Sequence, residues 1–179
     1  MARRVTAARR YAEAAFETGR SDGTLDSWER DMATIGRTMR HPRLRLLVQH
    51  PAIPFTEKER VLRTVMGRGV APAAVNLVLL MVRRGRPGAI EPMIVRFGEL
   101  LRRERGIALA QVSSALPLDD GQRAEIVARL RTLTGTKVEV DERVDPDLIG
   151  GVAVRIGDQL YDASVRSRLE RLRARLTTL

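Results

Sequence analysis

The residues of this sequence best suited to chemistry are two histidines, His41 and His50, each of which directly precedes a proline. Imidazole groups bind metals, but a metal site needs three or four converging ligands, and the residues near these histidines are poor ligands. The sequence contains no cysteine, which removes disulfides, thiolate metal sites and cysteine nucleophiles. We therefore interpret both histidines as turn residues and expect no metal site.

Paired carboxylates are the second group with catalytic potential, because two such groups can divide acid and base roles. The pairs are Asp119 with Asp120, Asp145 with Asp147, and Asp158 with Asp162. All of them occupy predicted turns or helix starts, where aspartate is common for structural reasons. Residues 134–137 lack the first glycine of a phosphate loop, and residues 150–157 do not match the dinucleotide-binding pattern. The sequence therefore predicts neither an enzyme nor a cofactor.

Helical periodicity dominates the first 105 residues. Apolar side chains recur at spacings of 3 and 4, as in Leu25, Trp28 and Met32, and glycine or proline interrupts each run. We predict that Gly19 ends the first helix and that Thr56 and Glu59 form a capping box at the start of a later one. Residues 1–105 are thus expected to form a bundle of six helices.

Residues 106–179 have a different pattern, in which strands alternate with helices. Strands are predicted over 107–115, 137–141, 152–156 and 159–162, with a helix between the first two. Asp119 and Gly135 are the expected ends of that helix, and a final helix is predicted to begin after Ser164. The predicted fold class is mainly α with two domains, a helical bundle followed by a small α+β domain.

The charge is concentrated in the first part of the chain. Residues 1–105 contain 21 Arg and Lys against 11 Asp and Glu, while residues 106–179 contain 11 of each. A basic protein of this kind could bind RNA or the ribosome. With only 1 Trp, 2 Tyr and 3 Phe, however, it offers few aromatic rings on which bases could stack. The longest apolar run, 77–82, is also too short to span a membrane, so we expect no direct membrane insertion.

Two predicted helices each carry an extra stripe of residues beyond the one that a bundle core requires. The stripes consist of Tyr11, Ala14 and Thr18 in the first helix and of Asn76, Leu80 and Arg83 in the helix over 72–84. Side by side, they would form a groove for an amphipathic partner helix. Alternatively, the second helix is central and buried on all sides. Periodicity leaves both alternatives open.

Three stretches of the sequence, 10–17, 76–86 and 138–169, resemble the delta subunit of F-type ATP synthase, the family of the oligomycin-sensitivity-conferring protein. The third is the most specific, and its motif includes Asp145, Gly150, Gly151, Val154, Arg155 and Gly157. The resemblance implies a non-catalytic stator subunit. Such a subunit links the alpha/beta catalytic head to the b-subunit peripheral stalk, so that rotor torque drives ATP synthesis.

The resemblance also implies partners for each domain. The helical domain would bind N-terminal segments of alpha subunits in the groove between its first and fifth helices. Tyr11, Ala14, Asn76 and Leu80 match the family's contact positions, and helical spacing adds Thr18 and Arg83. The second domain would contact the C-termini of the b subunits, loosely around Val165, Arg168, Leu169 and Leu172. The family further implies one copy per complex, no nucleic acid, and a place on the cytoplasmic face of the bacterial cell membrane.

Overall fold

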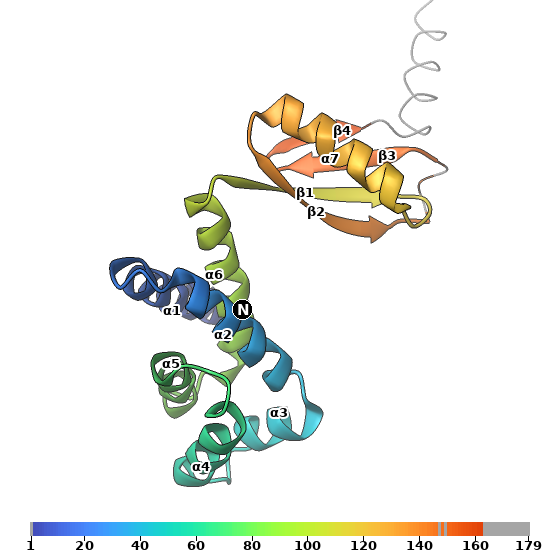
Figure 1. The fold of residues 1–179 in the computed structure, drawn as a ribbon. Helices are drawn as coiled ribbons and strands as arrows, with labels where there is room; N and C mark the ends of the chain where they lie inside the picture. The colour runs from blue at the N-terminus through green and yellow to red at the C-terminus, as the bar shows by residue number, and fades with distance from the viewer. Residues whose placement is uncertain (1, 147, 149, 163–179) are drawn as a thin grey trace, which may run out of the picture. The chain divides into compact units, whose positions relative to one another are not determined.

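The computed structural model describes residues 2–146, 148 and 150–162, and its contacts divide the chain into two compact units (Figure 1). One unit ends at Leu101 and the other begins at Arg102. The first is built from helices, and the second contains a small four-stranded sheet with a helix. The described chain is therefore mainly helical, as predicted, with its strands confined to the C-terminal part.

The helices of the first unit follow one another through short turns. They are α1 (Ala2–Ser21), α2 (Leu25–Met39), α3 (Pro42–Gln49), α4 (Phe55–Met66), α5 (Pro72–Arg83), the short 3₁₀ helix η1 (Pro87–Ala89) and α6 (Ile90–Glu104). Proline occupies the first position of α3, α5 and η1. Its missing amide hydrogen has no cost there, because the first turn of a helix has no internal acceptor for it.

Two predicted helix ends are wrong. Gly19 does not end α1, which continues to Ser21, and the left-handed residue after it is Gly23, with φ of 66°. Glycine is needed at position 19 for packing, because a Cβ atom there would lie 2.7 Å from Cδ1 of Trp28. Thr56 caps nothing, since α4 already begins at Phe55 after the extended backbone of Pro54.

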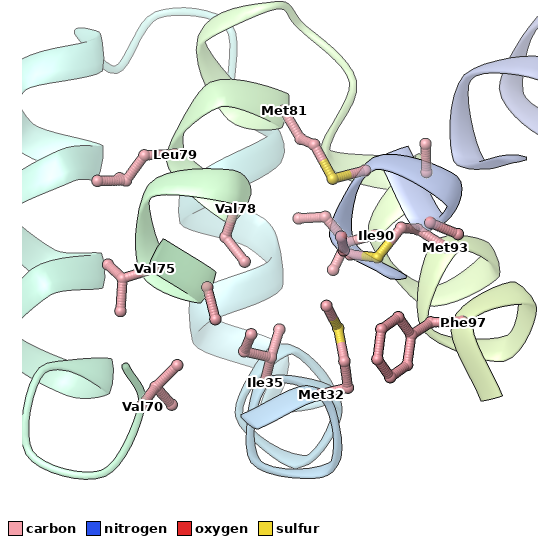
Figure 2. Close-up of a cluster of buried hydrophobic side chains, with 14 of the residues drawn as sticks. Met32, Ile35, Val70, Val75, Val78, Leu79, Met81, Ile90, Met93 and Phe97 are labelled. Carbon is pink, nitrogen blue, oxygen red and sulfur yellow. The ribbon is translucent and has the colours of Figure 1, made fainter. Parts of the chain in front are cut away.

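One hydrophobic core joins the helices of the first unit. Figure 2 shows Val78 and Met81 of α5 pointing toward Ile90 and Met93 of α6, while Leu79 points to the opposite side. Three aromatic residues pack at the middle of α6. The ring of Phe97 lies 6.3 Å from that of Phe16 and 6.4 Å from that of Trp28. Because the side chains of α5 share this core with residues of α1, α2, α4 and α6, several elements hold the helix in place.

A buried carboxylate also positions α5. Asp31 of α2 is only 6% exposed, and its Oδ2 accepts a hydrogen bond of 3.3 Å from the backbone N–H of Ala71. Ala71 directly precedes the first residue of α5, where a negative charge is favourable because helix N-termini carry unpaired N–H groups. The bond joins residues 40 positions apart, and no local sequence pattern signals it.

The sheet of the second unit has the strand order β2-β1-β3-β4. Its strands are β1 (Ile107–Ser114), β2 (Lys137–Val144), β3 (Val152–Ile156) and β4 (Gln159–Asp162). The strands β1 and β2 are parallel, whereas β3 is antiparallel to both β1 and β4. A parallel pair needs a crossover, and α7 (Asp120–Thr134) provides it, lying across one face of the sheet (Figure 1).

The ends of α7 and the β3–β4 hairpin confirm the sequence prediction. Asp119 accepts a hydrogen bond from the N–H of Gln122, whose side chain in turn caps Asp119. Gly135 closes the helix in the left-handed region, with φ of 65°, and Gly157 makes the hairpin turn with φ of 57°. Under α7, Val112 and Val154 are buried against Leu130.

Glu142 of β2 connects three parts of this unit. Its Oε1 accepts a hydrogen bond of 2.8 Å from the backbone N–H of Leu118, and its Oε2 accepts one of 2.8 Å from Arg123 of α7. The bond from Leu118, followed by that from Arg123, lowers the pKa of the Glu142 carboxyl. Bonding to Glu142 likewise raises the pKa of Arg123. The ionised carboxylate is thus the form that holds β2 to α7.

The tight contact at Gly19 predicts opposite effects for two helical glycine substitutions. Replacing a helical glycine by alanine usually stabilises a helix by about 1 kcal/mol. We expect Gly19→Ala to destabilise the helical unit instead, because the new methyl group would displace Trp28. Gly36→Ala is the control, since its Cβ would meet only Ile94 at an ordinary 3.6 Å, and it should stabilise. Urea unfolding followed by the fluorescence of the single tryptophan measures both, and a stabilised Gly19→Ala would contradict the packing.

The bonds of Glu142 predict a pH-dependent contribution to the stability of the sheet unit. Because its folded-state pKa is lowered, this contribution is complete above the ordinary pKa of glutamate, near 4.3. It is lost as the pH falls through the folded-state value. We therefore expect Glu142→Gln to destabilise the unit at pH 7 and to match the wild type well below pH 4.

Urea unfolding of the full chain, followed by the NMR amide signals of β1 and β2, measures this difference. Glu139→Gln, an exposed carboxylate on the same strand, serves as the control and should have no effect. An equal loss of stability from Glu142→Gln at both pH values would mean that the carboxylate's charge is irrelevant.

Candidate partner-binding surface

Helix α5 is buried on one side and open on the other. Six of its residues are buried: Ala74, Val75, Val78, Leu79, Met81 and Val82. The predicted second stripe, in contrast, is exposed at Asn76, Leu80 and Arg83, and Leu80 retains 43% of its accessible surface. Within the described residues, α5 is therefore not buried on all sides, and an apolar side chain is left facing outward.

Helix α1 has a similar division. Ala12, Ala15 and Phe16 are buried, whereas Ala14 and Thr18 are exposed and Tyr11 is half-buried against the core. The hydroxyl of Thr18 donates a hydrogen bond of 2.9 Å to the carbonyl of Ala14, which satisfies it within its own helix. The open side of α1 consequently presents a small methyl group and part of an aromatic ring, a surface that another helix can approach closely.

The two open stripes belong to helices that contact each other, since α1 packs against α5. Tyr11 and Leu77, one from each helix, are both partly buried against the same core. Each stripe lies opposite a buried face, so the side chains are carried on rigid elements. The structure thus brings together the two helices that the sequence singled out.

Arg83 and its neighbour Arg84 have different surroundings. The guanidinium carbon of Arg83 lies 5.9 Å from the ring centroid of Phe55, at the start of α4. Arg84 instead lines an open pocket together with Thr6 and Arg10 of α1. Sequence reasoning did not select Arg84, although it follows Leu80 at a spacing of four.

The C-terminal candidates divide into two groups. Val165, Arg168, Leu169 and Leu172 lie outside the described residues. Most of the motif residues belong to the sheet or its turns: Val154 is buried, Gly151 and Gly157 adopt positive φ of 81° and 57°, and Arg155 is exposed on β3. The N–H of Asp145 donates a hydrogen bond of 2.8 Å to the carbonyl of Ser114, just beyond the β1–β2 pair. In the described structure, these motif residues serve to build the sheet.

The histidines are turn residues, as predicted. His41 is the residue before α3, and His50 follows it, with Nδ1 accepting a hydrogen bond of 3.3 Å from the N–H of Ala52. Within residues 2–146, 148 and 150–162, no group of three or more His, Cys, Asp or Glu side chains could hold a metal ion. A search of the same residues finds no helix with the length and apolar character needed to cross a membrane.

Comparison with known proteins yields one family. The family model described as ATP synthase delta (OSCP) subunit matches residues 7–176. The chain is similar to the ATP synthase subunit delta of Synechococcus elongatus, with 37% identity over 164 residues, which is 90% of this chain and 91% of the relative. It is also similar to the subunit delta of Cupriavidus taiwanensis, with 34% identity over 179 residues and 99% of both chains.

A solved structure has a similar fold. It is a chain of the mitochondrial ATP synthase hexamer of Toxoplasma gondii, determined by cryo-EM. The TM-score is 0.72 at 27% identity, and the match covers 95% of this chain and 97% of that chain. The likeness therefore extends over nearly the full length of both proteins.

The contrast between neighbouring leucines on α5 predicts which of them the fold requires. Leu79 is 4% exposed and Leu80 is 43% exposed. We expect Leu79→Ala to destabilise the helical unit by about 2–5 kcal/mol, the cost of a cavity in a core. Leu80→Ala should cost less than about 1 kcal/mol, because much of that side chain is already in water. Urea unfolding followed by tryptophan fluorescence compares them directly, and equal losses would show that Leu80 belongs to the core.

Proposed function

Because the chain belongs to the ATP synthase delta (OSCP) subunit family, we propose that its helical unit holds an amphipathic N-terminal segment of an alpha subunit. The chain is a non-catalytic subunit of the F-type ATP synthase complex, which joins the catalytic head to the peripheral stalk. The alternative of a basic RNA-binding or ribosome-associated protein receives no support from these relatives.

The observation that carries the proposed contact is the pair of open stripes on α1 and α5. Leu80 is exposed on α5, and half-buried Tyr11 lies on α1. The two helices contact each other. An amphipathic helix binds by placing its apolar face into such a groove, and tyrosine is a common anchor at interfaces. Ala14 would leave room for the backbone of the docked segment. We therefore assign Tyr11, Ala14, Thr18, Asn76 and Leu80 to this contact, with Arg83 at its α4 side.

The proposed role is mechanical, and the packing beneath the groove suits it. A stator must resist the torque of the rotor, so its contacts have to be preformed and stiff. The buried sides of α1 and α5 enter a core that includes Phe16, Val78 and Met81. Little of the binding energy would then be lost to ordering the surface. The same rigidity would transmit force from the head through the helices.

The second unit would complete the connection to the stalk. We propose that the C-termini of the b subunits bind around Val165, Arg168, Leu169 and Leu172, and that one copy of the chain serves each complex. The family membership and the bacterial relatives support this arrangement, together with a peripheral place on the cytoplasmic face of the cell membrane.

A charge in the groove should weaken the alpha contact. We expect Ala14→Asp to weaken the binding of a synthetic peptide, the N-terminal segment of the same organism's alpha subunit, by at least about tenfold. The reason is that docking would bury an unpaired carboxylate. Isothermal titration calorimetry with the full chain measures the affinity.

Ala33→Asp, an exposed alanine on α2, is the matched control and should bind like the wild type. Circular dichroism of both variants checks that the helices remain folded. Unchanged binding by a folded Ala14→Asp variant would show that the segment does not dock between α1 and α5.

A further inference from the structure

An open pocket of about 980 Å³ lies where α1, α3 and the turn between α5 and α6 come together. Four arginines line it: Arg10 from α1, Arg45 from α3, and Arg84 and Arg86 from the turn. No aspartate or glutamate is among the residues of its described wall. The pocket is therefore strongly positive. Its arginines contribute to the excess of basic residues in the first 105 positions.

The four pocket arginines, like some other arginines of the helical unit, have no ion-pair partner among the described residues. Several arginines elsewhere in the unit do pair with a carboxylate three or four positions away, as Arg9 does with Glu13 at 2.7 Å and Arg96 with Glu99 at 2.7 Å. None of the pocket arginines has an ion pair or a side-chain hydrogen bond among the described residues. A carboxylate that does lie nearby, Glu91, lines the adjoining cavity, to which Arg45 also contributes. The pocket charge is thus left unneutralised by the chain itself.

The pocket lies toward the start of α1 and at the end of α5, the two helices that carry the open stripes. On α1, Arg10 of the pocket lies four positions before Ala14, and both residues are exposed. On α5, Leu80 is followed four positions later by Arg84. A segment lying along α1 and α5 would therefore reach the four arginines with one of its ends.

Backbone bonds hold the turn that carries two of these arginines. The N–H of Arg86 donates to the carbonyl of Met81 at 2.9 Å, and the N–H of Ala89 donates to the carbonyl of Arg86 at 3.0 Å. Gly85 allows the chain to reverse, with φ of 67°. η1 also contacts α1, α3 and α5. The wall of the pocket is therefore preformed, which lowers the entropic cost of binding.

We propose that this pocket receives carboxylates from an acidic end of the alpha-subunit segment whose apolar face lies between α1 and α5. The inference rests on the proposed function. It adds that the docked segment carries acidic side chains and that they lie at the end nearest the α5–α6 turn. Arginine suits this task because its planar guanidinium pairs with a carboxylate through two parallel bonds. A docked segment would bring several carboxylates and cover the arginines, whereas a small anion would leave most of this wide, open pocket charged.

The test compares two variants that remove the same charge from the helical unit. The Arg45→Gln/Arg84→Gln variant removes two pocket arginines, and the Arg43→Gln/Arg68→Gln variant removes two exposed arginines outside the pocket. Calorimetry with the full chain and the alpha N-terminal peptide is performed at low and physiological salt. We expect the pocket variant to bind about fivefold more weakly at low salt, with a shallower salt dependence. The control should bind like the wild type.

A second peptide, with its Asp and Glu replaced by Asn and Gln, completes the cycle. We expect this neutral peptide to bind the wild type as weakly as the original peptide binds the pocket variant. Its affinity for the pocket variant should be no lower than its affinity for the wild type. Equal weakening by the two arginine variants would mean that only long-range charge matters and would overturn the proposal. So would an original peptide that binds the pocket variant as well as the wild type.

Inorganic phosphate, titrated alone, tests the other occupant. Saturable phosphate binding that the pocket variant lacks, combined with peptide binding that ignores the variant, would assign the pocket to a small oxyanion and overturn the proposal. If the original peptide fails to bind the wild type at all, the proposed groove contact itself is wrong. If the peptide binds the wild type but the arginine variants do not change its affinity, the groove contact is retained and the proposed acidic end is wrong.

Discussion

The burial of one side of α5 is the interaction on which the helical unit depends. Val78 and Met81 enter the core beside residues of α6, and the carboxylate of Asp31 meets the backbone just before the helix begins. Together these contacts fix both the position and the rotation of α5 about its own axis. Because the rotation is fixed, the outward direction of Leu80 is fixed as well. The open stripe is thus a consequence of core packing.

The two units solve the same problem of stability with different contacts. In the helical unit, apolar packing dominates, and polar side chains at its surface pair mostly within their own helix. The sheet unit has a smaller core, and the bonds of Glu142 to Leu118 and Arg123 connect its strand to its helix. The stability of the sheet unit should therefore depend on pH more than that of the helical unit does.

Local patterns predicted most of the fold, and a contact between distant residues accounts for one of the two wrong helix ends. The capping box at Asp119 and the left-handed Gly135 were predictable, because each depends on a few neighbouring residues. Gly19 was misread because its reason is Trp28 in another helix. For the surface, periodicity identified the stripes on α1 and α5 but left their burial open. It selected Arg83, whose guanidinium lies over Phe55, and did not consider Arg84, which lines the pocket beside α1, because spacing does not tell which helix lies beside each residue.

The strand order β2-β1-β3-β4 has a consequence for the synthesis of the chain. The first strand to be made, β1, pairs with β2 and β3, both of which leave the ribosome later. No pair in this sheet can form before residue 137 has emerged, by which time the whole helical unit is available to fold. Each nascent chain therefore passes through a stage in which residues 107–114 lack their strand partners. During that stage the unpaired strand is open to association with other chains.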